Sequence, residues 1–489
     1  MAKRARREIL FTVNRASDVP LYRQLYEQAR DAIIQGVIEE GDRLPSIRRL
    51  SRELQISHTT IEQAYLQLSV EGYVTNMPRS GYAVAHFDAA FLRTERIANK
   101  LKVLQSEQHR SRMAFFAENS RGSTARYDFS YANLPADSFP VKVWRQLVND
   151  VMYANTAPEF ARYSYTDRVN DLSRQLSLYL GQARAVDCTP EQVILQPGSD
   201  NALTTLLTLF AREQHVVGIE EPGWATMREV AQRMGFKIVG VPTDQGREAF
   251  LDALRQQRPK IVFTTPSHQF PTGNVMQMET RIELLKWANE TNAYIIEDDS
   301  CNEYRYNTSP IPSLQSLDTH YRVVYLCNAS KVLSPSMRLA YLVLPPKLLG
   351  RYYRLYNGSH PSVSLLEQEV MARFIREGHW EQHIRRMAKR MHRRHDLLLE
   401  SLEREMGEHL TVEGMHTGMH LYVGVNNGMT QDELLQSAFK EGAAVYSAKR
   451  LWFTHPGRED KVLIGFSSIP SEDIPDGVAA LRRAWFPNK

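Results

Sequence analysis

The chain has 489 residues, of which 43% are hydrophobic, so it is long enough to form more than one hydrophobic core. Its formal net charge of only +4 does not by itself indicate a nucleic-acid partner. The three cysteines, Cys188, Cys301 and Cys327, form no CxxC pair and stand at no zinc-ligand spacing, which predicts no metal site and fits a reducing cytoplasm. No signal peptide and no run of about 18 apolar residues is present, so we expect a cytoplasmic protein with no membrane partner.

The first elements in chain order have the spacing of three helices. Apolar residues recur every fourth position from residue 21 to 33, which predicts an amphipathic helix that ends near Gly36. Pro45 and Ser46 supply turn and cap chemistry for a second helix, IRRLSREL. Ser57 can cap a third helix whose apolar residues share one face. We expect these helices to form a helix-turn-helix.

A hairpin is expected directly after these helices. The segment GYVTNMPRSGYAVA alternates around PRSG, which predicts a β-hairpin wing with Arg79 at its tip. The start of the third helix can enter the major groove of DNA, while arginines neutralise phosphates. Small three-helix units are common, so helix spacing alone leaves DNA binding open. The candidate DNA-binding residues are Arg48, Arg49, Ser57, His58, Thr59, Thr60, Arg79 and Ser80.

The composition changes after the wing. Residues 87–126 contain eight Lys or Arg against four Asp or Glu and lack strand-like runs, so we expect a basic, partly helical linker between domains at 15–86 and 127–489. Beyond it, VVGIEEP, KIVFTTP, YIIEDD and VVYLCNASK are short apolar runs that end in polar residues and are separated by helix-length segments. This pattern predicts a parallel α/β sheet, which binds its ligands at the carboxyl ends of its strands.

One lysine follows such a run. Lys331 comes after VVYLCNAS, and other strand ends supply QPGSDN, EEPGW, TPSHQFPTG and EDDSCNEYRY. A Schiff base to pyridoxal 5'-phosphate needs a lysine, a carboxylate for the pyridine nitrogen, a stacking ring, phosphate donors and an arginine, and all five types occur here. Each residue alone has a structural alternative, because Lys331 could be solvated, Asp298 could cap a strand, Trp224 could be core and PGS could be an ordinary turn.

Both halves of the chain resemble known families. GDRLPSIRRLSRELQISHTTIEQAYLQLSVEGYV with RSGYAVA resembles the GntR-type winged helix, although His58 and Arg79 stand where an arginine and a glycine are usual. TPSHQFPTG, EDD with EYRY, SK with Arg338 seven residues after the lysine, and EGHWEQHIRRM resemble a fold-type I aminotransferase. The combination resembles the MocR subgroup of GntR regulators, over residues 20–85 and 127–485.

The resemblance implies a multidomain fold and a cofactor. The expected fold is an N-terminal winged helix-turn-helix, an α/β aminotransferase-like domain and a small C-terminal α+β subdomain. Lys331 would form the Schiff base, Asp298 would pair with the protonated pyridine nitrogen and Trp224 would stack on the ring. The remaining candidate cofactor residues would hold the phosphate at a helix start, and these are Ser199, Asp200, Ser330 and Arg338.

Three sites differ from the usual pattern of the subgroup. Ser300 follows the paired aspartates where tyrosine is common. Asp200 and Asn201 replace glutamines, and a carboxylate near a phosphate is unfavourable unless it points away. Asn328 and Ala329 replace the usual TF ahead of SK. These differences favour cofactor binding over vigorous transamination, and they leave open whether either is weakened.

We therefore predict a transcription regulator that binds double-stranded operator DNA and senses pyridoxal 5'-phosphate, or a small amine or amino acid that reacts with it. A working aminotransferase with an accessory DNA-binding domain, and a regulator whose pocket no longer takes the cofactor, are the alternatives. The resemblance also implies a homodimer, domain-swapped and head-to-tail, with each winged helix over its partner's large domain.

The basic stretch HIRRMAKRMHRRH, residues 383–395, allows two interpretations. It could be a second DNA contact, or a solvated helix of the small subdomain. Ile384, Met387 and Met391 share one helical face, which favours the solvated helix.

Overall fold

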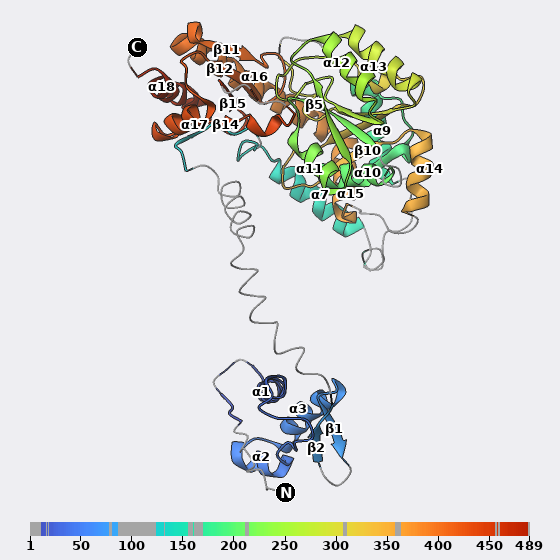
Figure 1. Ribbon diagram of the computed structural model, residues 1–489, viewed down its shortest axis with the longest axis vertical. Helices are drawn as coiled ribbons and strands as arrows, with labels where there is room; N and C mark the ends of the chain where they lie inside the picture. The colour runs from blue at the N-terminus through green and yellow to red at the C-terminus, as the bar shows by residue number, and fades with distance from the viewer. Residues whose placement is uncertain are drawn as a thin grey trace. The chain divides into compact units, whose positions relative to one another are not determined.

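The computed structural model divides into two compact units, Met1–Gly122 and Ser123–Lys489, which are described separately (Figure 1). The predicted wing-tip residues Arg79 and Ser80, and most of the predicted linker, lie outside the residues that the structure describes. The described residues are 11–15, 17, 19–77, 81–86, 124–131, 133–154, 160, 170–210, 215–306, 311–356, 363–454, 457 and 460–487.

The described part of the first unit contains three helices, α1 (Leu21–Gln35), α2 (Ile47–Leu54) and α3 (His58–Val70). Gly36 ends α1 in the left-handed conformation, at φ 72°. The side chain of Ser46 accepts a hydrogen bond from the amide of Arg49 at the start of α2, and Ser57 accepts one from Thr60 at the start of α3. The three predicted helices and their caps are confirmed.

The hairpin that follows α3 is also confirmed. β1 (Val74–Met77) and β2 (Gly81–Val84) pair antiparallel, with Val74 opposite Val84. Leu25, Ile61 and Leu68, each at most 1% exposed, pack in the core of this unit. The hairpin and the helices therefore form one small body around a single core.

The second unit is built on a seven-stranded sheet within the described residues, in the order β4-β10-β9-β8-β7-β5-β6. Parallel pairing joins β6, β5, β7, β8 and β9, as predicted, whereas β10 is antiparallel to both of its neighbours. A short apolar run does not reveal the direction of its strand, so this exception could not be predicted from the residues of β10. The strands are β4 (Val193–Gln196), β5 (Val216–Glu221), β6 (Lys237–Pro242), β7 (Ile261–Thr264), β8 (Tyr294–Asp298), β9 (Val323–Asn328) and β10 (Ala340–Val343).

Helices cover both faces of this sheet. Ile261 and Phe263 of β7 pack with α10 (Ser199–Thr208) and α11 (Ala225–Arg233), and Val262 between them packs with α12 (Arg247–Gln257) and α13 (Met278–Glu290) (Figure 1). Burial on both faces explains why the central strands read as continuous apolar runs. The other large helices are α7 (Val141–Ala154), α9 (Asp171–Arg184), α14 (Pro346–Leu355) and α15 (Leu365–Arg376).

The predicted C-terminal α+β subdomain is present. Its described strands form a sheet in the order β11-β12-β15-β14, namely Leu410–Glu413, His420–Val425, Lys461–Gly465 and Tyr446–Ser447. A short parallel pair, β3 (Tyr127–Asp128) with β13 (Ala443–Ala444), joins the start of the second unit to it. Its helices are α16 (His379–Met406), α17 (Gln431–Lys440) and α18 (Ile474–Trp485).

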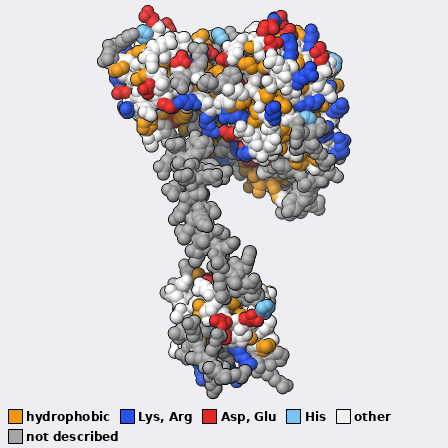
Figure 2. Space-filling view, viewed as in Figure 1, with side chains coloured by type: hydrophobic (Ala, Val, Ile, Leu, Met, Phe, Trp, Pro, Cys, Tyr) orange, Lys and Arg blue, Asp and Glu red, His pale blue; other side chains and the backbone are white. Residues whose placement is uncertain are grey.

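The basic stretch at residues 383–395 lies within α16. Met387 and Met391 are fully buried and Ile384 is partly buried, so the predicted apolar face is confirmed. Figure 2 shows acidic, basic and apolar side chains interspersed on the visible face of the second unit, in agreement with the small net charge. Within the described residues, we find no helix with both the length and the apolar character needed to span a membrane.

Candidate cofactor site and candidate DNA interface

The predicted cofactor residues gather where strands of the large sheet end. Asp298 is the last residue of β8, and β9 ends at Asn328, three positions before Lys331. Ala340, the first residue of β10, pairs with Gln196 at the end of β4 and with Asn328. β10 therefore brings the PGS turn, which follows Gln196, and the lysine turn, which follows Asn328, to the same edge of the sheet.

The PGS turn forms a cradle with Arg338. Gly198 has φ +91°, and a Cβ atom at this position would lie only 2.5 Å from the arginine Nη2 atom. Only glycine therefore allows the Arg338 guanidinium to pack against the turn. Ser199 begins α10, so amide groups and the positive end of the helix dipole point to the same place. A phosphate group fits this combination of charge and donors.

The unexpected carboxylate beside this turn points outward. The Oδ2 atom of Asp200 lies 3.4 Å from Nη2 of Arg233 on α11, and both side chains are exposed. Asn201 donates from Nδ2 to the carbonyl oxygen of Pro197, at 3.1 Å. Asp200 can therefore contribute its amide to an anion while its charge is turned toward Arg233.

Asn328 connects the phosphate turn to the aspartate loop. Its Nδ2 donates to Oγ of Ser300 at 2.7 Å and to Oγ of Ser199 at 3.2 Å, and its Oδ1 accepts from the amide of Ser330 at 3.1 Å. The amide of Ser300 in turn donates to Oδ1 of Asp298 at 2.9 Å. Sequence reasoning noted Asn328 only as a difference from the usual pattern and left it out of the site. Its position three residues before the lysine was the available signal.

Asp298 is a buried carboxylate without a cationic partner. It is 9% exposed, and none of the described residues forms an ion pair with it. Burial raises the pKa of Asp298 to about 6, although the hydrogen bonds from Ser300 and the charge of Lys331 act in the opposite direction. A protonated pyridine nitrogen would provide the missing positive charge.

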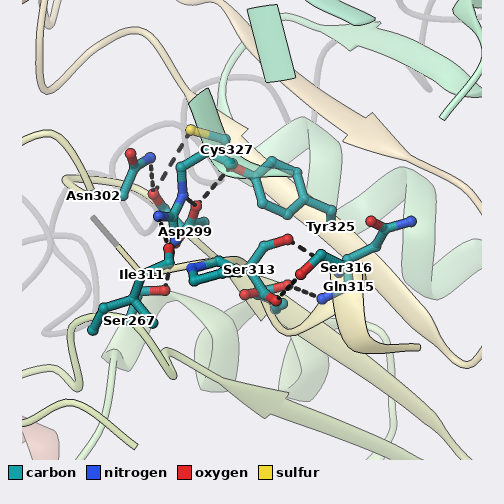
Figure 3. A network of polar contacts seen from close by, with 12 residues as sticks. Ser267, Asp299, Asn302, Ile311, Ser313, Gln315, Ser316, Tyr325 and Cys327 are labelled. Carbon is teal, nitrogen blue, oxygen red and sulfur yellow. Dashed lines mark hydrogen bonds and ion pairs between the residues drawn. The ribbon is translucent and has the colours of Figure 1, made fainter. Parts of the chain in front are cut away.

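The second aspartate of the pair has a different task (Figure 3). Asp299 accepts from Nε of Arg184 at 2.7 Å, from Nη2 of the same arginine at 3.0 Å and from the Tyr325 hydroxyl at 2.7 Å. Arg184 also donates to Oγ of Ser267 at 2.9 Å. This buried network holds the loop after β8 in place and gives Asp299, but not Asp298, an ion pair within the described residues. The sequence contained no signal for Arg184.

The lysine turn and the predicted stacking residue occupy defined positions. The Tyr304 hydroxyl donates to the carbonyl oxygen of Lys331 at 3.0 Å, and the Ser330 hydroxyl donates to that of Met337 at 3.2 Å. Ser330 thus bonds within the turn through its side chain. Trp224 is half-buried against Phe263, with the ring centroids 5.9 Å apart, so it is partly a core residue and keeps part of its indole accessible.

Sequence reasoning missed two buried histidines, His420, on which the charge of Lys331 acts, and His268, whose ring lies 5.9 Å from that of His420. His268 shares a hydrogen bond of 2.7 Å with Oγ1 of Thr417, and Nε2 of His420 donates to the carbonyl oxygen of Pro271 at 2.9 Å. Burial lowers the pKa of His268 to about 3 and that of His420 to about 4, and the charge of Lys331 also lowers the latter. Both rings are therefore neutral at pH 7.

The candidate DNA-binding residues lie on α2 and at the start of α3. Arg48, His58 and Thr59 are exposed. Arg49 is also exposed, but its Nε lies 2.6 Å from a carboxylate oxygen of Glu53. Arg48 is therefore the better candidate for a phosphate contact.

The remaining two described candidates, Ser57 and Thr60, stabilise the first turn of α3. The hydroxyls of Ser57 and Thr60 lie 2.7 Å apart, and the Ser57 oxygen also accepts from the amide of Thr60 at 3.2 Å. These contacts fix the first turn of α3, which presents its neighbouring side chains to solvent.

Comparisons with known proteins agree with this two-part construction. Residues 21–84 match the family model of bacterial regulatory proteins of the gntR family, and residues 128–459 match that of aminotransferase class I and II. The chain is 35% identical over 476 residues to the uncharacterized HTH-type transcriptional regulator YdeL of Bacillus subtilis (strain 168). The matched region covers 97% of this chain and 98% of that protein.

Two further proteins extend the comparison. The probable rhizopine catabolism regulatory protein MocR of Rhizobium meliloti is 29% identical over 484 residues, covering 97% of this chain and 96% of that protein. A crystal structure of Pyrococcus horikoshii kynurenine aminotransferase in complex with PMP has a TM-score of 0.66 at 22% identity and covers 81% of this chain and 98% of that chain. The chain belongs to the MocR-type HTH regulators of the GntR family, in which an aminotransferase class I and II domain follows the GntR domain.

Proposed function

We propose that this regulator binds operator DNA through its winged helix and holds pyridoxal 5'-phosphate at the Lys331 turn, where it senses the cofactor itself or a small amine or amino acid. The observation that carries the proposal is Asp298, a buried carboxylate near the lysine turn that forms no ion pair with any described residue. The PMP in the kynurenine aminotransferase structure, which has the same fold, supports a cofactor of this type.

The residues present fit the cofactor at each of its parts. Arg338 and Ser199 would bind the phosphate at the start of α10, and Asn328 would hold the Ser199 hydroxyl in place. Asp298 holds the proton on the pyridine nitrogen, and Trp224 offers its accessible face to the ring. The Lys331 amine is the nucleophile of the site. When bound, the cofactor supplies an electrophilic carbon that an incoming amine can attack.

The walls of the site suit a sensor of amines. His268 and His420 are neutral at pH 7, so they do not repel an ammonium group. The His420 ring lies 5.1 Å from that of Phe270 and 5.3 Å from that of Tyr131, which makes this wall aromatic. Ser300, where the subgroup commonly has tyrosine, favours binding over rapid turnover. Amino transfer to a keto acid over many turnovers would instead favour the alternative, a working aminotransferase.

We also propose domain bounds of 15–86, 87–126 and 127–489 and a head-to-tail, domain-swapped homodimer. Met152 and Tyr153, at the end of α7, are 52% and 90% exposed. Large apolar side chains that are this exposed in one chain support a contact with a second copy of the chain. Light scattering at micromolar concentration tests the dimer, and a monomer that still binds DNA tightly would contradict it.

The cofactor assignment is tested by borohydride reduction and peptide mapping. We expect one label on Lys331, and Lys331→Ala should lose the visible absorption band. Lys347→Ala on α14, an exposed lysine of the same domain, is the matched control and should keep the band. Label on another lysine, or none with excess cofactor, would contradict the assignment.

A further inference from the structure

The polar face of α16 borders a pocket that the proposed function does not use. The pocket has a volume of about 480 Å³ and lies between α16, the segment around Asp137 and the loop that contains Ser468 and Glu472. Its volume is within the range of about 300–1,000 Å³ found for small-molecule sites. The pocket includes none of the residues that we assign to the cofactor.

Arg394 is the residue that points to a ligand. It lines the pocket, yet it is only 6% exposed. Its Nη1 atom donates to the carbonyl oxygen of Ser467, and none of the described residues forms an ion pair with it. Burial lowers the pKa of Arg394 and the charge of Arg390 lowers it further, whereas the charges of Asp137 and Glu472 raise it. A buried arginine that forms no direct ion pair with the carboxylates around it is costly unless an anion joins it.

The other charges of the pocket leave a positive excess. Nη2 of Arg390 lies 2.7 Å from Oδ1 of Asp137, so these two charges compensate each other. Arg393 is exposed and has no ion pair among the described residues. Arg393 and Arg394 thus line the pocket together with one further carboxylate, that of Glu472.

We propose that this pocket binds a small phosphate-bearing anion, separately from the cofactor. Two guanidinium groups at one concave site match the oxygens of a phosphate through charge-assisted hydrogen bonds. The degree of burial favours a free anion over DNA, because the backbone of a duplex reaches exposed side chains and Arg394 is almost fully enclosed. The exposed arginines elsewhere on α16, such as Arg385, lie outside the pocket.

The anion would join segments that are distant in the chain. The hydroxyls of Ser467 and Ser468 donate to the carbonyl oxygen of Ser130, at 3.2 and 3.3 Å, so the pocket lies where the start of the second unit meets the end of the small subdomain. An anion bound to Arg393 and Arg394 would therefore connect α16 with the start of the second unit and with the end of the small subdomain. The site could therefore report the level of a phosphorylated metabolite to the segment that follows the linker.

The test is calorimetric titration of inorganic phosphate into the full chain saturated with pyridoxal 5'-phosphate, with chloride holding the ionic strength constant. We expect one phosphate per chain, and Arg393→Gln should weaken its binding by about tenfold or more. Arg385→Gln removes the same charge from the exposed face of the same helix and should leave phosphate binding unchanged. Arg338→Gln removes the guanidinium of the cofactor cradle and, titrated without cofactor, should leave phosphate binding at the α16 pocket unchanged as well.

Several results would overturn the proposal. They are no phosphate binding up to roughly 10 mM, equal weakening by Arg385→Gln and Arg393→Gln, or loss of binding in Arg338→Gln. A lower salt dependence of DNA binding in Arg393→Gln, without any phosphate binding, would assign this face to DNA instead. Thermal unfolding of each variant establishes that it is folded, and Arg393 is suited to substitution because it is exposed.

Discussion

At the scale of single residues, Asp298 connects the electrostatics of the site with stability. A pKa raised from 3.8 to about 6 means that ionising this carboxyl in the folded chain costs about 3 kcal/mol. The cost is absent below about pH 3, where the group is protonated in both states, and stability is lost as the pH rises from 3.8 to about 6. Above pH 6 the cofactor-free protein is therefore less stable than a variant with an uncharged side chain at position 298 would be.

Asp298→Asn should therefore stabilise the cofactor-free protein at pH 8 by up to about 3 kcal/mol and have little effect near pH 3. With cofactor the order should reverse, because only the charged form pairs with the pyridine nitrogen. Thermal unfolding at both pH values, with and without cofactor, measures this. Asp200→Asn, at an exposed position, should show no such pattern, and equal destabilisation by Asp298→Asn at both pH values would refute the account.

Asn328 allows a second prediction at this scale. Asn328→Ala removes the amide that joins Ser199 to Ser300, and cofactor affinity should fall by about tenfold to a hundredfold. Asn328→Asp should lower it further, since it adds a negative charge beside the phosphate. Absorbance titration with pyridoxal 5'-phosphate measures both. Asn201→Ala is the control on the same turn, and an equal loss there would show that only the fold of the turn had been disturbed.

The residues of the candidate site differ in how far the sequence could predict them. Lys331, Asp298 and Arg338 stand at recognisable offsets from strand ends. Arg184 joins Asp299 across 115 positions, and no local pattern records such a pair. The outward turn of Asp200 depends on Arg233, which belongs to another helix. Local chemistry could therefore be predicted, but the pairing of distant side chains could not.

At the scale of elements, the glycines that precede α10 and α12 have similar backbone angles but different surroundings, so they allow a controlled comparison. Gly198 precedes α10 at φ 91° and ψ 166°, and Gly246 precedes α12 at φ 87° and ψ 174°. A Cβ atom at Gly246 would meet nothing within 4 Å, whereas one at Gly198 would displace Arg338. Both Gly→Ala changes should cost about 1–2 kcal/mol of stability from backbone strain. Gly198→Ala alone should also lower cofactor affinity, by about tenfold, in the same absorbance titration.

Equal affinity in the two alanine variants would mean that the Arg338 cradle does not hold the phosphate.

The helices and strands also differ in how far the sequence could predict them. The ends of α1, α2 and α3 follow from single capping residues, Gly36, Ser46 and Ser57. The direction of β10 depends on which strands flank it, and a run of four apolar residues holds no such information.

At the scale of the whole molecule, the two units should respond separately to substitution. Arg48→Ala removes one phosphate contact and should reduce the log-log salt slope of DNA binding by about 0.9, without changing the cofactor spectrum. Arg23→Ala on α1, an exposed arginine whose Nε lies 3.1 Å from Glu27, is the control. Lys331→Ala should alter DNA affinity only through coupling between sites, typically about 1–3 kcal/mol. An unchanged slope in Arg48→Ala would remove this residue from the interface.

The position of β10 also bears on the order in which the molecule is completed during synthesis. The PGS turn leaves the ribosome long before the lysine turn, and the two become neighbours only when Ala340 pairs with Gln196 and Asn328. A nascent chain that ends before β10 thus contains the lysine but no assembled pocket. The proposed cofactor would bind only the finished arrangement, so its free energy of binding would favour closure of this edge of the sheet. In the cell, a chain that carries the cofactor would then be one whose large domain has finished folding.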